Sequence, residues 1–207
     1  AVHDLIKEYM TKHQRIIFNG NGYSDEWVAE AERRGLPNIK SMIEAVDTLT
    51  TEKSVNLFEK FGIFTKTELE SRAEVLYETY AKTINIEALT MIDMASKQYV
   101  PAIVKYTKSL ADTVVAVKDA GADAQVQTEI LKAVNGKLGE VKSALAKLEE
   151  AEAKAAAMDN VKDQAFFYKD VVKTAMDELR APVDEVEMMV DKKAWPVPSY
   201  ADLMFEV

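Results

Sequence analysis

Apolar residues recur every three or four positions between residues 66 and 120, a spacing that predicts a long helical run. Thr65 and Glu68 form a capping-box pattern at its start, and Gly121 directly follows its end. Pro101 interrupts the run once and permits a kink, because proline lacks the N–H that the helix needs. At 1.5 Å per residue such a rod spans about 80 Å, so other helices must lie along it.

A second pattern extends from residue 124 to about 180, where apolar steps alternate between three and four as in a coiled coil. Its positions are Leu131, Val134, Leu138, Val141, Leu145 and Leu148, then Val161, Ala165, Tyr168, Val172, Ala175 and Leu179. Asp159 or Asn160 separates the two halves, and Pro182 allows a kink or a fresh helix start. Two such helices joined by a short turn form an antiparallel hairpin.

The predicted fold is therefore all-α. It is an elongated antiparallel bundle of three to four helices, in which the heptad hairpin 124–180 packs along the Pro-kinked helix 66–120. Gly136 and Gly139 each cost about 1 kcal/mol relative to alanine inside the hairpin, and a close backbone crossing would explain them. The Ala-, Glu- and Lys-rich stretch 149–157 is expected to be exposed near the hairpin tip.

Short helices are expected before the rod. Residues 2–14 form an amphipathic pattern, with Val2, Leu5, Ile6, Tyr9 and Met10 on one face. Residues 16–18 are too few to distinguish a strand from a helix end. Three further helices are predicted: one capped by Ser24 and ending at Gly35, one starting at Asn38, and one from Thr50 or Thr51 to Gly62 with Val55, Phe58 and Phe61 inward.

The C-terminal segment cannot begin as a helix, because Pro196 and Pro198 each push the preceding residue toward extended geometry. A segment this apolar, with Trp195 at its head, is expected to dock on its own bundle or on a neighbour. Ser199 can cap a last helical turn that includes Leu203 and Phe205.

Composition narrows the class of protein. The 207 residues are 48% hydrophobic and 29% charged, enough for a substantial core, and the few glycines and prolines favour helix. A net charge of −9 argues against a nucleic-acid partner. No apolar run approaches the length of a membrane span. The absence of cysteine suits a reducing, cytoplasmic location.

Few residues offer chemistry. A di-iron centre in a helical bundle needs two Glu-x-x-His motifs, whereas the only histidines, His3 and His13, lack that spacing and are expected on a helix surface. The turn 19–22 before Ser24 has two interpretations, a backbone anion cradle or a plain turn. We assign no catalytic, cofactor-binding or metal-binding residue.

The middle of the rod is unusually polar. Its polar residues are Thr83, Asn85, Glu87, Thr90 and Asp93. A solvated face is the simplest interpretation; a buried polar cluster that fixes packing, or a subunit contact, are the alternatives. The nine methionines are expected to fill irregular gaps in the core.

Several colinear blocks resemble the C-terminal part of type III glutamine synthetases. They are RIIFNGNGYS at 15–24, EAERRGLPN at 30–38, LFEK at 57–60, FTKTELESR at 64–72, TINIEALTMIDMA at 83–95, KYTKSLAD at 105–112 and WPVPSYADL at 195–203. The resemblance covers nearly the whole chain and is weakest between residues 121 and 191.

This resemblance implies a parent ligase of nitrogen metabolism that joins ammonia to glutamate through a γ-glutamyl phosphate in glutamine biosynthesis. Such enzymes use ATP with Mg or Mn and assemble as stacked hexameric rings. The family's metal, nucleotide and phosphate ligands lie upstream, and no matching motif occurs here, so no catalytic residue carries over. Residues 1–23 would be the tail end of the catalytic region, and residues 24–207 the helical C-terminal domain.

The chain starts at Ala1, without Met and already in helical pattern, which favours a piece of a longer polypeptide. The expected function is a non-catalytic domain that packs on the rest of the synthetase chain and on neighbouring subunits, inactive by itself. The alternative is a free-standing helical scaffold whose hairpin recruits an unrelated partner.

Overall fold

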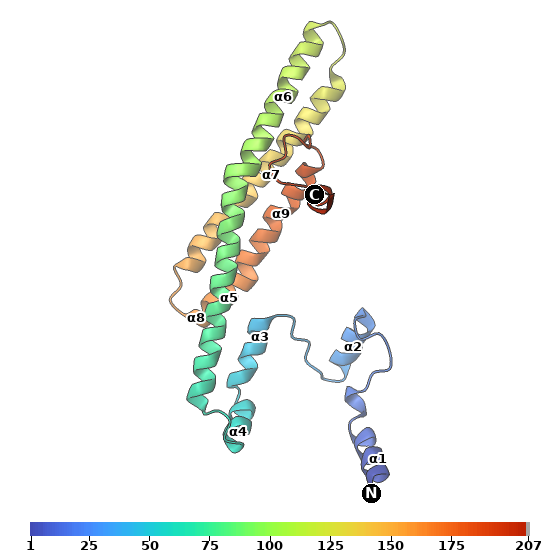
Figure 1. The fold of residues 1–207 in the computed structure, drawn as a ribbon, viewed down its shortest axis with the longest axis vertical. Coiled ribbons are helices and arrows are strands. Elements are labelled where there is room, and N and C mark those ends of the chain that lie inside the picture. Colours follow the sequence, from blue (N-terminus) through green and yellow to red (C-terminus); the bar gives the residue numbers. More distant parts are fainter. Residues whose placement is uncertain (206–207) are drawn as a thin grey trace.

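The computed structural model describes residues 1–205, which form helices and no strand. Three long helical layers build the bundle (Figure 1). The first is α5 (Lys66–Met94), η3 (Ala95–Tyr99) and α6 (Val100–Asp119); the second is α7 (Gln125–Ala156); the third is α8 (Val161–Phe167), η4 (Tyr168–Val172) and α9 (Lys173–Glu187). Successive layers run antiparallel, so the predicted all-α fold is confirmed.

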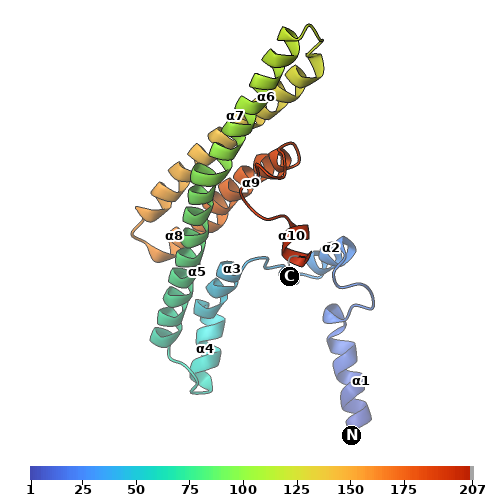
Figure 2. The ribbon, with the colours of Figure 1, turned by 45° about the horizontal axis from the view of Figure 1, so that its top comes forward.

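The first layer begins and ends as its sequence predicts. The Thr65 backbone N–H donates to Glu68 Oε2 at 2.8 Å, and the Glu68 N–H donates to Thr65 Oγ1 at 3.3 Å. Gly121 has a φ of 79°, the left-handed conformation that glycine tolerates. Before Pro101 the backbone widens into the π-turn η3, and the rod continues into α6 rather than ending (Figure 2). A wider turn leaves room for the proline ring.

The heptad prediction for α7 holds along most of its length. Val134, Val141, Leu145 and Leu148 are fully buried, whereas Leu131 and Leu138 are only partly buried. Asn160 caps α8, its Oδ1 accepting the Asp163 N–H at 2.9 Å. The third layer extends beyond residue 180, since α9 continues to Glu187. Pro182 does not start a new helix; it lies inside α9 and is buried.

No close backbone crossing occurs at the two α7 glycines. A Cβ atom built on Gly136 or Gly139 would meet nothing within 4 Å. The expected close approach is therefore wrong, and both positions retain the helix-weakening backbone freedom of glycine without a packing benefit.

Gly136→Ala is expected to raise the free energy of unfolding by about 0.5–1 kcal/mol, because alanine restricts the unfolded chain and meets no atom in the fold. Urea unfolding followed by far-UV circular dichroism measures the change. Gly121→Ala is the opposite control, since its φ of 79° strains any residue with a side chain. A loss of stability in Gly136→Ala would contradict the open surroundings.

Short helices precede the rod. They are α1 (Val2–Lys12), η1 (Gln14–Ile16), α2 (Asp25–Arg33), α3 (Met42–Val46), η2 (Asp47–Thr50) and α4 (Glu52–Lys60). Ser24 and Thr51 cap α2 and α4 as expected, and Gly35 and Gly62 have positive φ.

Two details of this region differ from the sequence prediction. The third short helix starts at Met42 rather than Asn38, because Ser41 supplies the cap by accepting the Glu44 N–H. Phe61 is 65% exposed, not inward, because α4 ends at Lys60 and Phe61 already belongs to the turn into Gly62.

The first helix stands away from the bundle. Figures 1 and 2 both show α1 and α2 to one side, joined to α3 by an irregular connection. None of the residues of α1 is buried, and its apolar side chains are between 48% and 73% exposed. The predicted amphipathic helix therefore forms without a partner for its apolar face among the described residues.

The C-terminal segment docks on its own bundle, one of the two predicted alternatives. Trp195 is only 9% exposed and stacks on Tyr99, with ring centroids 5.2 Å apart. The last helix, α10 (Tyr200–Phe205), follows Ser199, whose Oγ accepts the Asp202 N–H at 3.4 Å. The predicted cap and last turn are confirmed.

Candidate functional site

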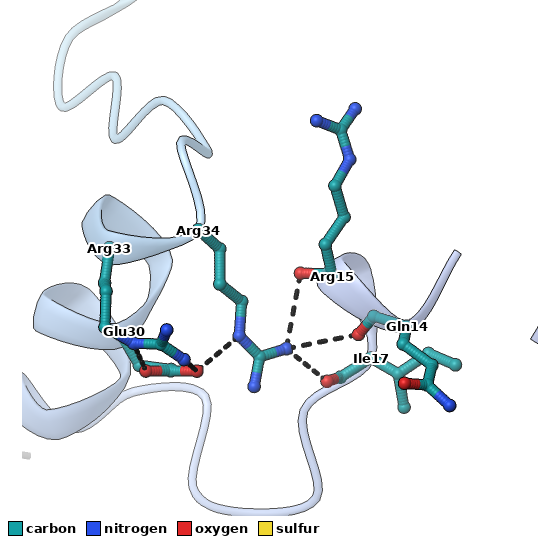
Figure 3. Close-up of polar contacts among 6 residues, drawn as sticks. All are labelled: Gln14, Arg15, Ile17, Glu30, Arg33 and Arg34. Atoms are coloured by element: carbon teal, nitrogen blue, oxygen red, sulfur yellow. Dashed lines mark hydrogen bonds and ion pairs between the residues drawn. The ribbon is translucent and has the colours of Figure 1, made fainter. Parts of the chain in front are cut away.

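A salt-bridged cluster ties α2 to the preceding segment (Figure 3). Glu30 accepts hydrogen bonds from two guanidinium groups, those of Arg33 at 2.5 and 2.6 Å and of Arg34 at 2.5 Å. These bonds, first from Arg33 and then from Arg34, lower the pKa of Glu30 to about 2. Glu30 therefore stays ionised at any physiological pH and holds both arginines on the last turn of α2.

Arg34 also reaches back across the loop. Its Nη1 donates to the carbonyl oxygens of Gln14 at 3.4 Å, Arg15 at 3.3 Å and Ile17 at 2.5 Å. These carbonyls lie in or just after η1. The carbonyl groups at a helix end have no N–H partner in a following turn, and the Arg34 guanidinium supplies donors to them. Arg34 thus fixes η1 against α2, a role that no sequence spacing signals.

Aromatic packing completes the same joint. Phe18 and Trp27 stack with ring centroids 4.4 Å apart, and the Arg34 guanidinium lies 5.7 Å from the Trp27 ring. Gly20 fits closely against this packing, because a Cβ there would approach the Phe18 ring to 2.7 Å and the ring would have to move.

The loop 19–22 is built as a turn. Asn21 Oδ1 accepts the Tyr23 N–H at 3.0 Å, and the Ser24 hydroxyl donates to the Asn21 carbonyl oxygen at 2.9 Å. These are the local bonds that Asn and Ser make in turns. They favour the plain-turn interpretation over an anion cradle.

A second polar cluster fastens α3 and η2 to the third layer. Lys169 Nζ lies 2.6 Å from Glu44 Oε1, and Lys162 Nζ lies 2.6 Å from Asp47 Oδ1. The Tyr77 hydroxyl donates to the same Asp47 carboxylate. Burial, together with the adjacent Asp47 carboxylate, raises the pKa of Tyr77, so it remains a neutral donor.

The polar middle of the rod divides into two environments. Asn85 Nδ2 donates to Glu152 Oε1 at 3.0 Å and to the Tyr168 hydroxyl at 2.7 Å, a partly buried bridge to the other two layers. The side chains of Thr83, Glu87, Thr90 and Asp93 are exposed. Most of this stretch is therefore a solvated face, and Asn85 alone belongs to a polar packing cluster.

No group of three or more His, Asp or Glu side chains within residues 1–205 could hold a metal ion. His3 and His13 are exposed, near opposite ends of α1. The two clusters described above join helices, and their charged groups are already paired with each other. Among residues 1–205, none of the helices combines the length and the hydropathy of a membrane-spanning segment.

Comparison with known proteins gives the family. The family model described as the glutamine synthetase C-terminal domain matches residues 1–118. The chain is 38% identical over its full length to a glutamine synthetase of Butyrivibrio fibrisolvens, 34% identical over 99% of its length to the type-3 glutamine synthetase of Dictyostelium discoideum, and 31% identical over 99% to a glutamine synthetase of Bacteroides fragilis. It spans only about 30% of each relative's length. The chain therefore belongs to the glutamine synthetase C-terminal domain family.

Proposed function

We propose that this chain is a non-catalytic helical domain of a glutamine synthetase, and that it supports the packing and assembly of the enzyme. The exposed apolar face of α1 carries the proposal. A helix that buries none of its five large apolar residues lacks the contact that stabilises helices in proteins. A partner surface would gain about 25 cal/mol for each Å² of apolar area that it covers.

The proposed partner of α1 is the rest of the synthetase polypeptide. The relatives have about 70% of their length outside the match, room for a complete catalytic region. In this proposal residues 1–23 close that region, and residues 24–207 form the appended domain that contacts neighbouring subunits in hexameric rings. ATP and Mg or Mn bind outside these 207 residues, and the assembled ligase is cytoplasmic.

An assay of the purified chain tests the non-catalytic part. With ATP, glutamate, ammonia and magnesium, no glutamine formation is expected, because the reaction needs metal-bound ATP and the described residues provide no metal site. The Butyrivibrio fibrisolvens enzyme serves as the positive control under the same conditions. Genuine turnover by the 207-residue chain would refute the proposal.

A chimera tests the packing role. This chain replaces the matching segment of the Butyrivibrio fibrisolvens enzyme, and the assembly of the active chimera is followed by analytical ultracentrifugation. Ile6→Ser is expected to reduce the assembled fraction and the activity together, because it removes an apolar contact of α1. Lys7→Ser is the matched control on the same helix. An equal assembled fraction and equal activity for the two variants would contradict the proposed role of α1.

A further inference from the structure

The C-terminal segment 191–205 is attached to the bundle by apolar contacts. Trp195 stacks on Tyr99 with an interplanar angle of 26°, and Ala194 and Val197 pack, partly buried, against the core. Beyond Val197 the chain leaves the bundle surface as α10, which Figure 2 shows projecting from the third layer. The apolar side chains of α10, Leu203, Met204 and Phe205, are all exposed.

Several polar contacts form within this segment. Asp191 Oδ1 accepts the Lys193 N–H at 2.7 Å, and the Asp191 carbonyl accepts the N–H groups of Ala194 and Trp195. Asp202 pairs with Lys192 Nζ at 2.5 Å and accepts the Ser199 N–H at 2.8 Å. These hydrogen bonds and this ion pair hold the segment in shape.

The main anchor carries a polar defect. Trp195 Nε1 is buried and has no hydrogen-bond partner among the described residues. A buried donor without a partner opposes the docking that the indole ring favours, because it recovers hydrogen bonds with water when the ring is released. The docked position of Trp195 is thus stabilised by ring packing and destabilised by its own N–H.

Tyr99 connects the segment to a mostly apolar groove. The groove has a volume of about 270 Å³ and lies between α5–η3 and α9. Tyr99, Met91, Met94, Leu179 and Val183 form its apolar walls, and Arg180 and Asp184 also line it. Because Trp195 packs on Tyr99, its position fixes one wall of the groove. Tyr99 also ends the π-turn η3, and such turns are frequent at functional sites.

We propose that residues 191–205 form a detachable strap. The Trp195–Tyr99 contact opens while the three helical layers stay folded, and opening frees the Tyr99 ring, which forms one wall of the groove. Apolar packing of the Trp195 ring stabilises the closed state, and hydration of the freed indole N–H stabilises the open state. The strap opens as a unit, because the contacts of Asp202 with Lys192 and Ser199 lie within it and move with it.

Separate unfolding transitions test the strap directly. In a Trp27→Phe background, Trp195 is the remaining tryptophan and reports strap opening by its fluorescence, whereas far-UV circular dichroism reports the helices. We expect the Trp195 emission to shift to the red at lower urea concentrations than the loss of helix. Coincident transitions would show that the strap is an integral part of the bundle and would overturn the proposal.

Two substitutions at Trp195 supply an independent readout. Trp195→Ala is expected to accelerate tryptic cleavage after Lys193 by about tenfold, with the thermal midpoint of the helices lowered by less than about 3 °C. Trp195→Phe retains a ring for the Tyr99 stack and removes the unpartnered N–H, so its cleavage should be no faster than that of the wild type. Leu203→Ala, on exposed α10, is the control. Faster cleavage of Trp195→Phe, or a Trp195→Ala midpoint loss as large as that of a core truncation, would contradict a separately opening strap.

Discussion

Leu148→Ala is expected to lower the free energy of unfolding by about 2–5 kcal/mol, because it empties a fully buried position in the seam of α7. Leu148 lies in the continuous core that joins the three layers. Its close-packed neighbours can fill only part of the cavity that the substitution creates. For a chain of this size the same loss lowers the melting temperature by about 5–15 °C. Urea unfolding and thermal scans by circular dichroism measure both.

The control for this substitution is Leu203→Ala, which removes the same atoms from a side chain that is 68% exposed. Its effect should stay within about 0.5 kcal/mol. A Leu148→Ala variant as stable as Leu203→Ala would mean that the seam does not carry the fold.

The sequence predicts the three layers well because helical periodicity and capping are local properties. The stripe of 66–120, the heptad positions of α7 and the caps at Ser24, Thr51 and Thr65 all depend on residues within a few positions of each other. Tertiary packing did not override them. For the same reason the positive φ of Gly121 could be expected from its place after the helix.

The two π-turns are invisible to the same reasoning. Each adds one residue to a turn without changing the type of residue that faces the core: Tyr168 and Val172 are both buried across η4, four positions apart as in an α-helix. Pro101 suggested an irregularity but not its kind, and η4 has no proline to mark it. Neighbouring layers decide where such a turn forms.

The polar joints also escape prediction, since their partners are far apart in sequence. Arg34 binds carbonyl oxygens 17 to 20 residues upstream, and Lys169 pairs with Glu44 across 125 residues. An Arg or Lys on a helix surface has many possible acidic neighbours, and spacing selects none of them. The only usable signal was the Glu30–Arg34 spacing of four, which predicts a local pair but not the second contact of Arg34.

Tyr168→Ala is expected to cost about 3–5 kcal/mol of stability, the second large effect. The Tyr168 side chain is 2% exposed at the start of η4, and its hydroxyl oxygen accepts a hydrogen bond from Asn85 of the rod. Tyr168→Phe separates the two contributions, because it retains the ring and removes only the hydroxyl. Asn85 then retains Glu152 as its partner, so only the net contribution of one hydrogen bond, about 0.5–1.5 kcal/mol, is expected to be lost.

A double-mutant cycle with Asn85→Ala assigns the polar part of this loss to the contact itself. If the hydroxyl acts through Asn85, the Tyr168→Phe and Asn85→Ala effects measured by urea unfolding will be non-additive by about 0.5 kcal/mol or more. Tyr106→Phe, at a partly buried tyrosine of α6 whose hydroxyl has no described hydrogen bond, is the control and should be nearly neutral. Additive losses would mean that Tyr168 stabilises the bundle by ring burial alone, and that the polar centre of the rod does not hold the layers in register.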